Sequence, residues 1–162
     1  MAHEFYVTIE GTKQGKFKGE SLRKDHAAKF AGLSIEYSVQ SPRDAATGMP
    51  SGKRQHSPIV ITKEWGASSP QLFQAVTSNE LLKSVLFEFI KTDASGKEHI
   101  YFTMTLENAT VSEFKQLTSE EAGAKHSEAL DTFELEEIAF TFQKITLENK
   151  DAKTSASDDW KA

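Results

Sequence analysis

The chain contains no cysteine, which excludes disulfides, thiolate nucleophiles and zinc sites built on sulfur. Stability therefore does not depend on the redox compartment. Long apolar runs are also missing, since the most apolar stretch, residues 81–90, is interrupted by Lys83 and Glu88. A helix needs about 20 apolar residues to cross a bilayer, so we expect no membrane insertion.

Other absences narrow the class of partner and the route of export. The first residues, MAHEFYVTIEG, contain no basic stretch followed by an apolar run, so we expect no cleavable secretory signal. The protein would then be made in the cytoplasm and, if secreted, would leave by another route. The net charge of −5 argues against nucleic acid or an anionic membrane as partner. A length of 162 residues suits one domain with a sizeable core.

Catalytic and ligand-binding motifs are missing as well. The sequence has no GxSxG, P-loop or GxGxxG pattern. Its five histidines form no HxH or HExxH pair. Adjacent carboxylates such as Glu136 and Glu137 are typical of a solvated face. We therefore predict no catalytic residues, no cofactor and no metal site.

Period-two alternation is what the sequence does contain, and it predicts half-buried strands. Four segments show it on one face: Phe5, Val7 and Ile9; Leu33, Ile35, Tyr37 and Val39; Phe102, Met104 and Leu106; Ile138, Phe140 and Phe142. Phe133 and Leu135 have the opposite parity to the run from Ile138, which predicts a bulge near residues 136–137. Residues 81–90 fit either a helix or a strand, and we favour a strand from about Ser84, followed by a hairpin turn at residues 95–96.

One short helix is predicted after residue 68. Ser69 is the expected N-cap and Pro70 suits the first helical position. An apolar stripe of Leu72, Phe73 and Val76 follows, and the helix should end at residues 78–79. Together these patterns favour a mainly β fold, an antiparallel β-barrel or two-sheet sandwich with one short α-helix and a long extended loop.

Three segments have no clear strand or helix pattern. Residues 41–57 form a long loop rich in Gly, Pro, Ala and Ser that carries Arg43, Lys53, Arg54 and His56, and structureless loops of this length are usually functional or disordered. Residues 118–131 read as a weak helix or a second excursion. Residues 150–162 read as a polar C-terminal tail, expected to be mobile although it contains Trp160.

Four passages in the same order resemble the Hcp (haemolysin-coregulated protein) family, the tube protein of type VI secretion systems. They are GKRQHSPIVITKEWGASSPQL from residue 52, YFTMTLENATVSEFKQL from residue 101, EEIAFTFQKITLEN from residue 136 and KGESLRKDHAAKFAGLSIEYSVQS from residue 18. The resemblance covers roughly residues 4–149, which defines an Hcp-like domain over residues 1–149. The turn at residues 11–18 is longer than the family's usual first turn, and Leu81-Leu82 replaces a more polar approach to the next strand.

The resemblance implies a compact β domain that forms homohexameric rings, and rings that stack into an exported tube. Partners would be further copies of the chain, the sheath, spike and baseplate proteins of the secretion machine, and small effector proteins in the lumen. Arg43, Lys53, Arg54 and His56 become candidates for ring stacking or subunit contact. Ser34, Glu36 and Ser38, on the polar face of their strand, become candidates for the lumen wall.

Three other functions stay open at this point. A small-ligand-binding β-barrel needs interior room, whereas the inward residues of the predicted strands are large and apolar. A tail-tube protein of a phage-like contractile particle would share the fold. A hydrolase would need a pair such as His56 and Glu64.

Overall fold

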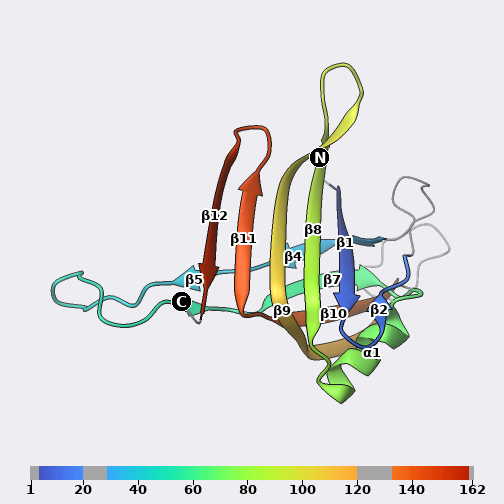
Figure 1. The fold of residues 1–162 in the computed structure, drawn as a ribbon, viewed down its shortest axis with the longest axis horizontal. Helices are drawn as coiled ribbons and strands as arrows, with labels where there is room; N and C mark the ends of the chain where they lie inside the picture. The colour runs from blue at the N-terminus through green and yellow to red at the C-terminus, as the bar shows by residue number, and fades with distance from the viewer. Residues whose placement is uncertain (1–3, 20–28, 120–132, 161–162) are drawn as a thin grey trace.

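The computed structural model describes residues 4–19, 29–119 and 133–160 (Figure 1). In this part of the chain the structure is mainly antiparallel β, with one helix. The strands are β1 (Glu4–Gly11), β2 (Gly15–Lys16), β3 (Phe30–Gly32), β4 (Ser34–Glu36), β5 (Val39–Gln40), β6 (Gln55–His56), β7 (Ile59–Glu64), β8 (Leu82–Thr92), β9 (Glu98–Ser119), β10 (Phe133–Thr141), β11 (Lys144–Asn149) and β12 (Thr154–Asp159), and the helix is α1 (Ser69–Ser78).

The first sheet has the order β2–β1–β8–β9–β11–β12, with β3 also paired to β1. The predicted alternation of β1 is confirmed, since Phe5, Val7 and Ile9 are all buried. Residues 82–92 form β8, which confirms the strand prediction. The predicted turn that joins β8 to β9 is also present, and Gly96 takes φ +86°, a backbone conformation that favours glycine.

Strand β9 connects the two sheets because it is 22 residues long and bends. Its first half pairs with β8 and β11, and its second half pairs with β10. Asn108 lies at the bend with φ +52°, and the register with β10 shifts between Ala139 and Phe140, which leaves Ser112 of β9 as the extra residue. Such corners let a strand pass from one sheet to another.

The predicted bulge near residues 136–137 is therefore wrong. The bulge lies on β9 rather than on β10, and β10 keeps its alternation through this region because Glu136, Ile138 and Phe140 all face the interior. The parity argument failed because a carboxylate occupies a core position. The prediction that Glu136 lies on a solvated face is wrong for the same reason, since the residue is fully buried.

The second sheet has the order β9–β10–β7–β4, and its strands cross behind those of the first sheet (Figure 1). The core lies between the two sheets, and the edge-to-face contact of Phe87 with Phe140, at 6.1 Å between ring centroids, joins them. Of the two architectures expected, the two-sheet sandwich describes the structure. Within the described residues the ladders do not close into a barrel.

Helix α1 packs at one end of the sandwich (Figure 1). It begins and ends close to the predicted residues, but Ser68 is the N-cap and makes no side-chain capping bond. Asn79 ends the helix in the left-handed conformation, with φ +53°. Leu72 and Ala75 face the core, whereas Phe73, expected in the buried stripe, is 56% exposed and packs edge-on against Phe114.

The C-terminal segment is ordered, so the expectation of a mobile tail is wrong for the residues up to Trp160. Residues 154–159 form β12, which pairs with β11 along its whole length. The strand was not predicted because TSASDD has a single apolar residue, Ala156, and little alternation of polar and apolar side chains. The boundary placed at residue 149 stays a prediction. Most of the predicted excursion at residues 118–131 lies outside the described residues.

Candidate assembly surfaces

Residues 41–57 form an arm that projects from the body of the molecule (Figure 1). Its base is the short ladder of β5 with β6, and an isolated bridge pairs Arg43 with Pro50 farther out. The tip is a built turn: the Asp44 carboxylate accepts hydrogen bonds from the Ala46 and Thr47 amides. The Asp44 amide also donates to the Met49 carbonyl at 2.8 Å. The arm therefore presents a defined tip.

A polar cluster fastens the base of the arm to β12. His56 Nε2 lies 2.6 Å from Asp158 Oδ2, and the Tyr37 hydroxyl lies 2.6 Å from His56 Nδ1. A neutral ring with its proton on Nε2 satisfies both contacts, since Nδ1 then accepts from Tyr37. Arg54 donates to the same carboxylate and to the Asp159 carbonyl. The acidic end of β12 thus fixes two residues of the arm.

The ionisation of this cluster follows from its contacts. The hydrogen bond from Arg54 and then that from His56 hold the pKa of Asp158 below its ordinary value of 3.8. Burial, with the nearby Asp158 charge, raises the pKa of the Tyr37 hydroxyl. Tyr37 is therefore protonated at neutral pH and can donate the hydrogen bond to His56.

An apolar groove of about 460 Å³ opens beside this cluster. The His56 ring contacts Phe142 edge-on, with centroids 5.4 Å apart, and lies 5.0 Å from the Trp160 ring. Phe142 is buried, whereas Trp160 is 48% exposed. The Asn108 amide donates to the Gln143 side chain at 3.1 Å on the groove's polar rim.

The second sheet has an open face on the side away from the core. Ser34 and Glu36 lie on it, both exposed at the edge strand β4. Directly paired residues share a face, so the ladder places Ser34 in one row with Thr62, Glu137 and Lys115. The face carries more acidic than basic groups, its ionisable residues being Glu36, Glu64, Glu113, Glu137 and Lys115.

The sequence matches the family described as "Type VI secretion system effector, Hcp" over residues 6–148. The chain belongs to the Hcp family. It is 34% identical to the "Major exported protein" of Pseudomonas aeruginosa, with 100% of this chain and 98% of that protein covered.

Solved Hcp structures share this fold over nearly the whole chain. A crystal structure of an Hcp protein has a TM-score of 0.87 at 29% identity, covering 98% of this chain and 100% of that one. The Hcp1 protein of E. coli EAEC 042 has a TM-score of 0.84 at 30% identity, covering 98% and 99%. The secreted protein Hcp3 of Pseudomonas aeruginosa has 0.78 at 29%, covering 99% and 100%.

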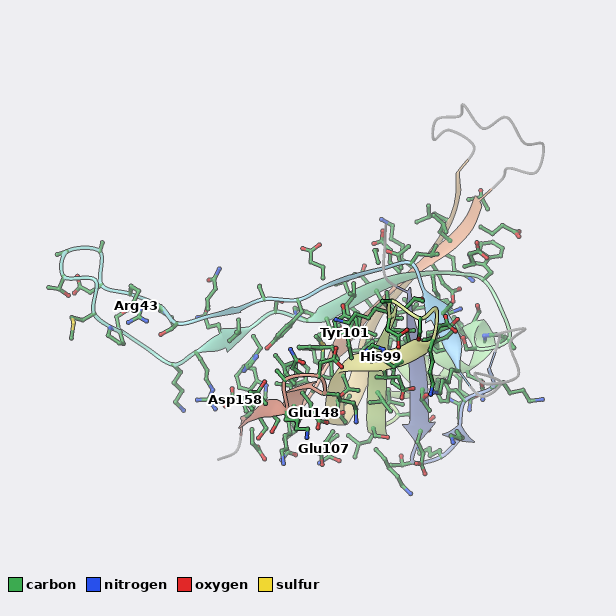
Figure 2. All side chains as sticks on the ribbon, turned by 90° about the horizontal axis from the view of Figure 1, so that it is seen from above. Arg43, His99, Tyr101, Glu107, Glu148 and Asp158 are labelled. Carbon is green, nitrogen blue, oxygen red and sulfur yellow. The ribbon has the colours of Figure 1, made fainter. Side chains whose placement is uncertain are left out.

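The candidate residues of this Hcp chain fall into distinct places. Arg43 and Lys53 are exposed on the arm and form no ion pair with any residue of the described ranges. Arg54 and His56, expected to face a neighbouring copy, contact Asp158 of their own chain. Figure 2 shows Arg43 far out on the arm and Asp158 near its base.

The lumen candidates are divided in the same way. Ser34 and Glu36 share the open face, whereas Ser38 lies at the root of the arm, where its amide donates to the Ser57 hydroxyl at 2.9 Å. Sequence reasoning missed Asp158 and gave Met49 no role. A single large apolar side chain in a loop of small and polar residues was the available signal for Met49.

Within residues 4–19, 29–119 and 133–160, no group of three or more His, Asp or Glu side chains is arranged to hold a metal ion. None of the helices found there is long and apolar enough to cross a membrane.

Proposed function

We propose that the chain is the structural subunit of a type VI secretion inner tube, in which six copies close into a ring and rings stack. The observation that carries this proposal is the Hcp match along residues 6–148, together with a fold whose surfaces suit self-assembly. Tip and base of the arm are different surfaces, as a head-to-tail contact requires. The name of the exported Pseudomonas relative supports secretion of this chain.

The open face of the second sheet is the proposed lumen wall. Ser34 and Glu36 lie on it, and its excess of carboxylates would be repeated six times around a ring. Effector proteins carried there would meet a polar surface rather than an apolar one. Ser38, at the root of the arm, would lie near the rim of the channel.

The arm is the proposed contact with a neighbouring subunit or ring. Arg43 and Lys53 are its available cations, and each exposed ion pair contributes only about 0–1 kcal/mol. Repetition around a ring would make such contacts collectively effective and still reversible. Arg54 and His56 would act indirectly by fixing the base of the arm. Sheath, spike and baseplate proteins are the further partners in this proposal.

In this proposal the chain has no catalytic role, and the protein is made in the cytoplasm and exported by the secretion machine. Light scattering of the purified protein tests the assembly. A mass of six subunits is expected, and a monomer over a wide concentration range would contradict it.

A further inference from the structure

The arm tip and the groove at its base complement each other chemically, yet they lie apart within one molecule. Met49 is 62% exposed at the tip, although it is a large apolar side chain. The groove presents the rings of His56, Phe142 and Trp160. Thioether groups pack favourably against aromatic rings, so the two surfaces suit each other.

The arm cannot bring its own tip to its own groove without losing its structure. The eight residues from Met49 to His56 span about 25 Å when extended, at roughly 3.3 Å each. Hydrogen bonds of the Asp44 carboxylate and backbone fix the turn at the tip. Gly48 takes φ +75°, and its amide donates to the Asp44 carbonyl at 2.8 Å. Figure 1 shows the arm running away from the body, so the occupant of the groove has to come from another molecule.

Charge favours the same pairing. Arg43 lies beside the tip through its bridge to Pro50, and Lys53 follows farther down the arm. Asp159 at the end of β12 adjoins the groove, since its carboxylate accepts a hydrogen bond from the groove residue Gln143, whereas Asp158 already contacts Arg54 of the same chain. A basic arm with an apolar tip thus matches an aromatic groove that has the Asp159 carboxylate beside it.

We propose that Met49 of one copy docks in the His56–Phe142–Trp160 groove of another copy of this chain. The inference rests on the proposed self-assembly and specifies which surfaces meet. Because the tip is already ordered, docking loses little conformational freedom. The contact is head-to-tail, so every copy offers one tip and one groove.

The absence of cysteine allows a direct test by oxidative cross-linking. A double variant, Met49→Cys with Thr141→Cys in the groove wall, should give a covalent ladder of dimers, trimers and larger species. Each single variant should give dimers at most. The matched control, Met49→Cys with Ser155→Cys on β12 outside the groove, should give no ladder.

Electron microscopy of the same samples separates the two hypotheses. Rings without a ladder, or a ladder in the control pair alone, would overturn the docking inference and leave the tube proposal intact. Monomers alone would contradict both. Met49→Ala should also weaken assembly about two- to tenfold, the effect of one sulfur–aromatic contact, and an unchanged assembly concentration would count against the inference.

Discussion

At the residue scale, the sandwich contains a buried ion pair between Lys63 and Glu136, and burying these charges costs free energy. Both side chains are fully buried and their charged atoms are 2.7 Å apart. The Ser69 hydroxyl and the Gln116 amide also donate to the Glu136 carboxylate, and Lys63 donates to the Glu64 carbonyl. These bonds offset the free-energy cost of desolvating two charges. They also join α1 to β7, β9 and β10.

Removing one partner of this pair should be costly. Glu136→Ala leaves a buried ammonium group without its anion, so we expect a loss of about 3–5 kcal/mol in the free energy of unfolding. Lys63→Met with Glu136→Leu should recover most of the loss. Urea unfolding measures both, and Lys83→Ala, which breaks the exposed pair with Glu10, is the control expected to change stability by about 0–1 kcal/mol.

Glu80 introduces a pH dependence at the end of the helix. Its carboxylate accepts hydrogen bonds from the Lys13 and Gln14 amides and the Gln14 side chain. Burial alone would raise its pKa, but these hydrogen bonds outweigh burial and hold the pKa below the ordinary 4.5. A carboxyl whose pKa is lowered in the folded state stabilises the fold at pH values above its ordinary pKa, here 4.5. This contribution is lost as the pH falls through the folded-state pKa.

Glu80→Gln should therefore destabilise the protein at pH 7 by about 1–3 kcal/mol. The difference from wild type should shrink as pH falls below 4.5. Urea unfolding at a series of pH values measures this, with the exposed Glu10→Gln as control. A constant difference across the series would contradict the assignment.

At the scale of elements, the pose of the arm depends on β12 through Asp158. The hydrogen bonds from Arg54 and His56 lower the pKa of this carboxyl, so they favour its ionised form. Asp158→Asn should loosen the base of the arm and speed tryptic cleavage after Lys53 several-fold. Asp151→Asn is the matched control, because Asp151 likewise contacts one histidine and one basic side chain, His99 and Lys91, but at the opposite end of the β11–β12 hairpin. Equal cleavage of both variants would show that Asp158 does not fix the arm.

The sequence predicted those elements whose burial is one-sided and apolar. β1 and the first half of β9 have large apolar side chains at every second position, and Pro70 with Asn79 delimits the helix. β8 was ambiguous, because its apolar residues fit a helix as well as a strand. β10 was misread because Glu136 stands at a core position, and its partner Lys63 is distant in sequence. β12 was missed because all its residues except Ala156 are polar, so it shows no alternation of polar and apolar side chains.

The candidate surfaces could likewise be predicted only where they depend on local sequence. Loop composition was enough to single out the arm and its cations. Arg54 and His56 contact Asp158 only because β12 pairs with β11 and so lies beside the arm. A local sequence pattern does not predict this pairing. The groove likewise forms from residues of four separate segments, so it had no signature in the sequence.

At the scale of the whole molecule, charge is distributed unevenly. The chain has a net charge of −5, yet exposed cations mark its arm. The open face of the second sheet is acidic. Such polarity suits a subunit that contacts its neighbours through one surface and offers another to a channel.

Negative-stain electron microscopy of the purified wild-type chain, viewed down the symmetry axis, tests the central claim most directly. We expect rings of six subunits around an open channel, with the second sheets lining it. Particles of monomer size alone, or rings of a different symmetry, would contradict the account.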